Sequence, residues 1–350
     1  MSNESSQIEY PWFPFIGQMA RMQKLEESER RIFASLGIEY VSRMIKIPFK
    51  NSEIYTISVQ CDAPEKTLDH PIVLVHGFGA GVAMWGAAIR MFSKFQTVHA
   101  FDLLGFGRSS RPTFSTNHRD AENEMVESIE MWRNEMSINK MNLVAHSFGG
   151  YLATSYAIKY PSRVNKLVLA DPWGFNEVNP TFEQNLSTTA KVISSVYLKF
   201  NPLALLRAVG SYGPSMMRRF RPDLREKYSD HVYDYVYLCN SQSPTGEAAF
   251  KSLAEKLAWA KEPMSKRFHG LDENLPVVFI HGQRSWIDWT SISDLISGRS
   301  NTDMMIIEEA GHHVYADNTS RFTEIVIESL RKGVQDDMND SKREPVEVES

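Results

Sequence analysis

The sequence predicts an α/β protein built on a mostly parallel sheet, with helices on both faces and an inserted helical cap. Short apolar runs alternate with helical segments along most of the 350 residues, as a parallel sheet requires. Between residues 176 and 273 no comparable strand run appears, so this stretch is interpreted as the insertion. Over residues 142–150 an apolar strand changes abruptly into a helix at a serine, which predicts a sharp turn at one strand end.

The first element is an aromatic segment followed by a helix. Residues 10–16 hold Trp12, Phe13 and Phe15 together with two prolines, and prolines exclude a regular helix there. The helix is expected over residues 19–36. One interpretation of the aromatic segment is a strap that packs across the core.

The sheet is expected to begin with two antiparallel strands at its edge, residues 40–49 and 53–59, which show alternating polarity and are joined by a turn. The remaining strands should be parallel, because helical segments separate them; they are expected at residues 72–75, 97–101, 141–145, 166–170, 277–280 and 304–307.

These elements divide the chain into five parts. They are an N-terminal segment and helix at 1–36, the first part of the core at 37–175, the cap at 176–273, the second part of the core at 274–333, and a tail at 334–350. The tail is polar and acidic, and we expect it to be disordered.

Ser147 is the candidate nucleophile. It lies between Ala145 and Gly149, at the point where the strand ends. A tight strand-to-helix turn needs small residues two positions before and two after the serine, since larger side chains would collide with the neighbouring strand or helix. Alanine replaces the usual first glycine here but still fits sterically. The pattern predicts a nucleophile elbow.

A glycine-rich loop, His76-Gly-Phe-Gly-Ala-Gly81, follows the strand at 72–75. Such a loop can direct backbone N–H groups toward a developing oxyanion. We expect one donor from Phe148, directly after the nucleophile, and a second from Phe78 in the loop. The alternatives are an ordinary strand-to-helix turn or a dinucleotide-binding loop, although the G-X-G-X-X-G spacing of a dinucleotide-binding loop is absent.

A serine nucleophile needs a base, and His312 is the candidate. It directly follows Gly311 after the last predicted strand, whereas His313 is expected to point elsewhere. A base of this kind takes the proton from the serine hydroxyl.

The acid that orients the histidine is expected to be Asp288, in the loop after the strand at 277–280. Asp294 falls inside the following helix and Asp272 precedes the strand, so both fit less well. A helix cap is the alternative role for Asp288. The resulting order of Ser, Asp and His is that of α/β-hydrolases.

Seven runs along most of the chain share the pattern of one group of proteins: Tyr10-Pro-Trp-Phe-Pro-Phe, His76-Gly-Phe-Gly-Ala-Gly, Asp102-Leu-Leu-Gly-Phe-Gly-Arg-Ser-Ser, Tyr160-Pro-Ser-Arg-Val, Asp171-Pro-Trp-Gly-Phe, Arg284-Ser-Trp-Ile-Asp and Gly311-His-His-Val-Tyr-Ala-Asp317. The chain thereby resembles the abhydrolase-domain-containing proteins four and five, animal α/β-hydrolases of phospholipid and lipid-droplet metabolism. The resemblance implies the α/β-hydrolase fold and a lipid acyl substrate. It also implies that His312 and Asp317 form a signature associated with lysophosphatidic acid acyl transfer.

The resembled family divides at the elbow. Members four keep a serine there, whereas vertebrate members five carry asparagine and act chiefly as coactivators of a triglyceride lipase. This chain has Ser147. We therefore expect a serine hydrolase of lysophospholipase or acylglycerol lipase type, acting on lipid acyl esters in phospholipid and neutral-lipid homeostasis.

Two other functions stay open. One is a lysophosphatidic acid acyltransferase that uses His312 and Asp317; the other is a coactivator of a triglyceride lipase at lipid droplets. If the protein is a hydrolase, Asp317 is expected to cap the last helix, which should begin near Asn318.

Composition limits the partners and the compartment. The net charge of −5 argues against a nucleic-acid partner. The N-terminus lacks the basic and apolar parts of a signal peptide and the chain has two cysteines, which favours a cytoplasmic, reducing location. The longest uncharged stretch, 71–89, contains glycines and His76, so no transmembrane helix is expected. Neither a cofactor nor a metal is expected.

Peripheral binding to lipid droplets or intracellular membranes is implied by the resemblance. Trp12, Phe13 and Phe15 are the candidates for this contact, since aromatic rings of this kind favour an interface between apolar and wet surroundings. Inside the cap, residues 216–225 interleave arginines with apolar side chains. This run either meets phosphate head groups or forms a solvated amphipathic helix.

Overall fold

The computed structural model describes residues 18–61, 68–178, 201–255 and 259–340. Within these ranges one eight-stranded sheet has the order β1-β2-β4-β3-β5-β6-β9-β10. The strands are β1 Val41–Ile47, β2 Ser52–Val59, β3 Ile72–Val75, β4 Val98–Phe101, β5 Met141–His146, β6 Val164–Ala170, β9 Val277–Gly282 and β10 Thr302–Ile307. β2 pairs antiparallel with β1 and β4, and the other neighbours are parallel. The predicted fold class and its antiparallel edge are confirmed.

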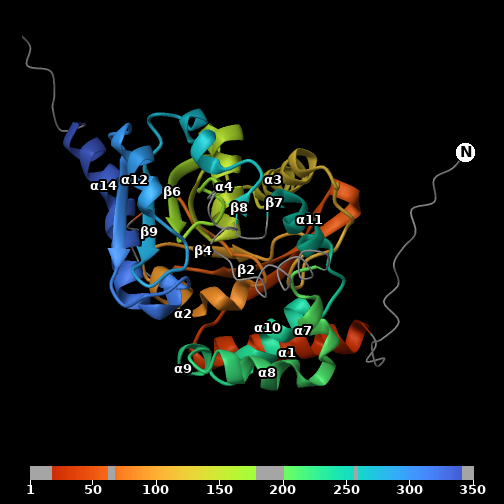
Figure 1. The fold of residues 1–350 in the computed structure, drawn as a ribbon. Helices are drawn as coiled ribbons and strands as arrows, with labels where there is room; N and C mark the ends of the chain where they lie inside the picture. Colours follow the sequence, from red (N-terminus) through yellow and green to blue (C-terminus); the bar gives the residue numbers. More distant parts are fainter. Residues whose placement is uncertain (1–17, 62–67, 179–200, 256–258, 341–350) are drawn as a thin grey trace, which may run out of the picture.

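Helices cover both faces of the sheet (Figure 1). The core helices are α1 Gln18–Ser35, α2 Gly86–Phe92, α3 His118–Glu135, α4 Phe148–Lys159, α12 Thr290–Ser297, α13 Val314–Asp317 and α14 Thr319–Asp340, with short 3-10 turns η1 Phe49–Asn51, η2 Val82–Trp85 and η3 Pro161–Arg163. Side chains alternate between the faces of a strand. Val73 and Val75 accordingly join the apolar cluster under α3 and α4, whereas Ile72 and Leu74 join the cluster under α1, α2 and α14. A buried parallel strand therefore needs a continuous apolar run.

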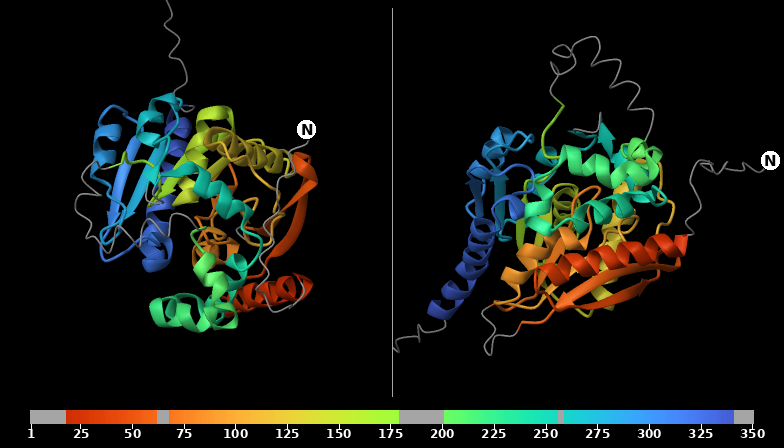
Figure 2. Two further views of the ribbon diagram at one scale, coloured as in Figure 1. Left: turned by 45° about the vertical axis from the view of Figure 1, so that its right-hand side comes forward. Right: turned by 90° about the horizontal axis from the view of Figure 1, so that it is seen from below.

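The described part of the cap is mainly helical. It contains α7 Ala204–Ala208, η4 Gly210–Tyr212, α8 Gly213–Phe220, α9 Leu224–Tyr228, α10 His231–Asn240, α11 Thr245–Leu253, the two-stranded β7 Ala254–Glu255 and β8 Trp259–Ala260, and the turns η5 Met264–Lys266 and η6 Phe268–Gly270. Helix α1 lies against α10, so the N-terminal helix and the cap pack side by side (Figures 1 and 2).

Helix α14 extends to Asp340 at the C-terminal end of the described residues. The expected disorder of residues 334–350 stays a prediction. Residues 341–350, as well as Trp12, Phe13 and Phe15, lie outside the described residues.

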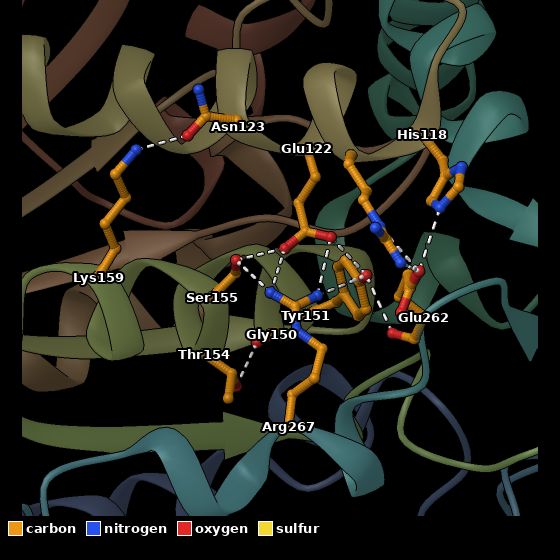
Figure 3. Close-up of polar contacts among 11 residues, drawn as sticks. His118, Glu122, Asn123, Gly150, Tyr151, Thr154, Ser155, Lys159, Glu262 and Arg267 are labelled. Atoms are coloured by element: carbon orange, nitrogen blue, oxygen red, sulfur yellow. Dashed lines mark hydrogen bonds and ion pairs between the residues drawn. The ribbon is translucent and has the colours of Figure 1, made fainter.

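A polar network ties the segment after β8 to the core helices (Figure 3). Arg267 pairs with Glu122 of α3 at 2.6 Å and also reaches Ser155 of α4. The hydroxyl of Tyr151 donates to Glu122 at 2.7 Å and lies 3.2 Å from the backbone carbonyl of Glu262. Glu122 is buried, and a buried carboxylate needs such partners. The network therefore fixes where the chain returns from the cap to the sheet.

None of the helices in the described ranges has the length and hydropathy needed to cross a membrane.

Candidate active site

The serine turn has the geometry of an elbow. Ser147 sits between β5 and α4 with φ 53° and ψ −122°, a conformation that L-residues rarely adopt. A Cβ on Gly149 would lie 2.4 Å from the backbone oxygen of His76, and one on Gly77 would lie 2.9 Å from the Cβ of Ser147. Ala145 is fully buried. Small residues are therefore required around Ser147, because backbone atoms occupy the space that larger side chains would need.

Three side chains from distant parts of the chain form one hydrogen-bonded series. The Nε2 atom of His312 lies 3.0 Å from the Oγ atom of Ser147. The Nδ1 atom of the same ring lies 2.6 Å from the Oδ2 atom of Asp171. This is the relation between nucleophile, base and orienting acid that acyl transfer from an ester to a serine requires.

The orienting carboxylate is not the one predicted from the sequence. Strands β6 and β9 are parallel neighbours, so loops after both strands lie at the same edge of the sheet. Asp171 follows β6 directly, has φ 46°, and donates its backbone N–H to Ile280 in β9 at 2.8 Å. Asp288 comes later in the loop after β9 and lines a separate pocket. The structure therefore places Asp171, and not the predicted Asp288, against His312.

Asp171 is held by more than the base. His281 Nδ1 lies 2.9 Å from Asp171 Oδ1, and the hydroxyl of Ser285 donates to Oδ2. Burial would raise the pKa of Asp171, but the hydrogen bonds from His281 and His312 outweigh it and lower the pKa to about 2. The carboxylate is therefore ionised at neutral pH, and since it can only accept, Nδ1 of both histidines carries a proton.

The contacts of His281 and Ser285 with the acidic residue were not predicted from the sequence. Both lie at or just after the end of β9, the strand beside β6. Their signal was present, because polar residues at the carboxyl ends of adjacent parallel strands meet. The same signal marks Asp171, which directly follows an apolar strand.

His146, the residue before the nucleophile, supports the base. Its Nε2 donates to the backbone oxygen of His312 at 2.9 Å, and the two rings are 4.7 Å apart. Burial, together with the neighbouring His312 ring, lowers the pKa of His146 to about 3, so the ring is neutral and keeps its donor on Nε2. His313 directly precedes α13 and, as expected, is not the ring that reaches Ser147.

The predicted oxyanion donors lie under aromatic side chains. Helix α4 begins at Phe148, and the first N–H groups of a helix have no partner within it. The ring of Phe250, from cap helix α11, lies 4.3 Å from that of Phe78 and 4.9 Å from that of Phe148. The cap thus covers the two residues expected to supply the N–H groups. Their role as donors remains a prediction.

Asp317 has a different role from the helix cap predicted for it. Its Oδ2 accepts from the backbone N–H of Gly311 at 2.7 Å, and its Oδ1 pairs with Lys227 of the cap. The first turn of α14 is capped instead by Asn318, whose Oδ1 accepts from Arg321 N at 3.1 Å. Asp317 therefore holds the loop that carries His312.

The arginines of the cap are partly engaged with other cap residues. Arg218 pairs with Asp230 at 3.1 Å, and Arg221 pairs with Asp223 at 2.8 Å. Arg219 is exposed. No group of three or more His, Cys, Asp or Glu side chains suited to a metal ion occurs in the part of the chain that the structure describes.

Comparison with known proteins identifies the family of the chain. Residues 70–319 match the family described as alpha/beta hydrolase fold. The chain is 58% identical over 324 residues to the Caenorhabditis elegans abhydrolase domain-containing protein abhd-5.2. The match covers 92% of this chain and 73% of that protein.

Two mammalian relatives are similar over most of their lengths. The chain is 43% identical over 316 residues to the Mus musculus (lyso)-N-acylphosphatidylethanolamine lipase, covering 88% of this chain and 91% of that protein. It is 40% identical over 313 residues to the Homo sapiens 1-acylglycerol-3-phosphate O-acyltransferase ABHD5, covering 87% of this chain and 88% of that protein. Among solved structures, naproxen esterase from Bacillus subtilis matches with a TM-score of 0.63 at 15% identity, covering 90% of this chain and 99% of that one.

Proposed function

Because the chain belongs to the α/β-hydrolase family and, within it, to the abhydrolase-domain-containing proteins four and five, we propose that it is a serine hydrolase acting on lipid acyl esters. The observation that carries the proposal is the hydrogen-bonded series of Ser147, His312 and Asp171. The lipid substrate is supported by the names of relatives that act on lipid acyl groups.

The proposed reaction has two halves. Ser147 Oγ attacks the ester carbonyl carbon while His312 Nε2 takes the hydroxyl proton, and the oxyanion forms against the backbone N–H groups of Phe148 and Phe78. Collapse of this intermediate breaks the ester bond, and the proton returns from His312 to the departing alcohol. Water then attacks the acyl-serine in the same way and releases the fatty acid. Asp171 stabilises the imidazolium in both halves.

Acyl transfer to lysophosphatidic acid is the second candidate, favoured by the name of the relatives that are 40–41% identical. In this chain Asp317 is bound to Gly311 N–H and Lys227, and His312 is already the partner of Ser147. Transfer would therefore use the acyl-Ser147 intermediate, with an acceptor alcohol in place of water. The difference between the two reactions lies in the acceptor and not in the residues.

Labelling with a fluorophosphonate tests the nucleophile. The probe should modify Ser147 covalently, and Ser147→Ala should abolish both labelling and hydrolysis of lysophospholipids and monoacylglycerols, while circular dichroism shows an intact fold. Normal turnover by the alanine variant would exclude the serine mechanism. Adding lysophosphatidic acid as acceptor to the same assays separates hydrolysis from transfer, since only transfer produces a diacyl product.

Peripheral attachment to lipid droplets or membranes through Trp12, Phe13 and Phe15 belongs to the same proposal. Burying these rings would contribute a few kcal/mol at about 25 cal/mol per Å², enough for reversible binding. Replacing all three with alanine should release the protein from liposomes without loss of short-chain esterase activity. A coactivator role for a triglyceride lipase would instead predict that Ser147→Ala still stimulates that lipase.

A further inference from the structure

A pocket of about 180 Å³ beside the active site is lined by three tryptophans, Trp173, Trp259 and Trp286, and by the polar residues Asn176 and Asp288. These residues come from three segments: the loop after β6, the strand β8, and the loop after β9. Trp286 is 59% exposed, a large apolar side chain left in contact with solvent. Concave sites lined by aromatic side chains with a few polar groups are typical of ligand binding.

Two of the tryptophans that line the pocket lie next to residues of the reacting centre. The ring of Trp286 lies 5.2 Å from the ring of His312. The ring of Trp173 lies 6.0 Å from that of Phe148, the residue after the nucleophile. A substrate whose ester lies at Ser147 can therefore place its other end in the pocket.

The walls of the pocket are held by bonds that do not involve the reaction. Asn176 Nδ2 donates to the backbone oxygen of Asp288 at 2.6 Å, which joins the loops after β6 and β9. Met264 N donates to the backbone oxygen of Gly174 at 2.8 Å. Trp173 packs 5.5 Å from Tyr151, which is itself fixed by Glu122 in the network of Figure 3. The site is thus organised before any ligand arrives.

Size and chemistry limit what the pocket can take. Pockets that enclose a whole drug-sized ligand measure about 300–1,000 Å³, so 180 Å³ suits a compact group rather than a long acyl chain. Tryptophan faces attract cations, and aromatic cages bind quaternary ammonium groups. Asp288, an exposed residue that also lines the pocket, adds an acidic side chain that attracts a cation.

We propose that this tryptophan pocket, comprising Trp173, Trp259, Trp286 and Asp288, binds the ammonium head group of a lysophospholipid. The inference rests on the proposed ester hydrolysis and names its substrate class. In such a lipid a glycerol phosphate separates the ester from the ammonium, so a head-group site should lie beside the reacting serine and not at it. The pocket has this position.

Binding is measured without turnover, in the Ser147→Ala protein, by tryptophan fluorescence at constant ionic strength. Choline is compared with 3,3-dimethylbutan-1-ol, which has the same shape and no charge. Choline should bind about tenfold or more tightly than the alcohol. Asp288→Asn and Trp286→Leu should each weaken choline binding about five- to tenfold, and Trp286→Phe should weaken it less because one aromatic face remains.

Asp294→Asn is the matched control, because it makes the same change of charge on α12 at a residue that does not line the pocket. Choline binding by this variant should equal that of the parent. Equal binding of choline and the uncharged alcohol, or equal effects of the substitutions at Asp288 and Asp294, would overturn the proposal.

Kinetics then distinguish a lipid head group from free choline. The active protein is given lysophosphatidylcholine and lysophosphatidic acid with the same short acyl chain. The ratio of their kcat/KM values should favour the choline lipid and should fall about tenfold in Asp288→Asn, mainly through KM. An unchanged ratio of the two kcat/KM values would show that the pocket does not distinguish the two head groups. If neither lipid is hydrolysed, the proposed function fails, while the choline measurements still decide whether the pocket binds ammonium.

Discussion

The choice between two aspartates as the acid can be tested by replacing each with asparagine. In the structure Asp171 Oδ2 lies 2.6 Å from His312 Nδ1 and Oδ1 lies 2.9 Å from His281 Nδ1. An amide at this position keeps the shape but removes the charge that stabilises the imidazolium. It also allows the wrong tautomer of His312, because the amide N–H₂ can donate to Nδ1.

The expected loss follows from this geometry. Removing the acid charge while keeping its shape lowers kcat about 10⁴-fold in the serine-protease triad, which corresponds to about 5 kcal/mol of transition-state stabilisation. Asp171→Asn should show a loss of that order. Asp288→Asn should cost no more than about tenfold, because Asp288 lines the tryptophan pocket. The assay is kcat on a short-chain p-nitrophenyl ester, with circular dichroism to check the fold.

The folded state must also be compared, because Asp171 is fully buried and the hydroxyl of Ser285 loses its acceptor when the amide N–H₂ takes the position of Oδ2. A buried group left without its hydrogen bond costs about 1–3 kcal/mol, so the urea midpoint of Asp171→Asn should fall while a folded baseline remains. The reasoning is refuted if folded Asp171→Asn retains most activity and Asp288→Asn loses it, which would return the acid to the loop after β9.

Three further outcomes are expected. Asp317→Ala should lower stability by about 1.5–3 kcal/mol and reduce kcat, because the N–H of Gly311 loses a charged acceptor; an unchanged kcat in a less stable protein would show a purely structural role. Burial raises the pKa of Glu29 to about 8 from 4.5 despite Arg108 beside it, so the folded protein holds a proton that the unfolded chain has released. The contribution of Glu29 to stability should therefore be fully present below pH 4.5 and be lost as pH rises through 8. Urea titrations at several pH values should show that Glu29→Gln lacks this decline in the free energy of unfolding, and an equal decline in both proteins would contradict the prediction. Gly149→Ala should destabilise by about 1–3 kcal/mol or prevent folding, since the new Cβ would meet backbone oxygen at 2.4 Å, and a stable, active variant would disprove the steric argument for the elbow.

Much of the fold was predictable because its signals are local. A strand buried on both faces needs a continuous apolar run, and the runs at β3, β5 and β9 are of this kind. The signal of the elbow is also local, since Ser147 and the small residues Ala145 and Gly149 stand together in the sequence, although the backbone oxygens that limit the size of Gly149 belong to Val75 and His76. The base was predictable because it follows the last strand directly.

The partners of these residues were decided only by the tertiary structure. Two aspartates follow neighbouring parallel strands, and sequence spacing does not distinguish which carboxylate turns toward His312. The contact between Asp171 Oδ2 and His312 Nδ1 does so. Likewise, the distance in sequence between His312 and Asp317 does not reveal that the carboxylate binds Gly311 and Lys227. The sequence by itself determined the strands, the place of Ser147 at the turn after β5 and the place of His312 after the last strand, because each depends on neighbours in the chain. The acid and the tryptophan pocket depended on which loops meet at one edge of the sheet, and that is a property of the folded molecule.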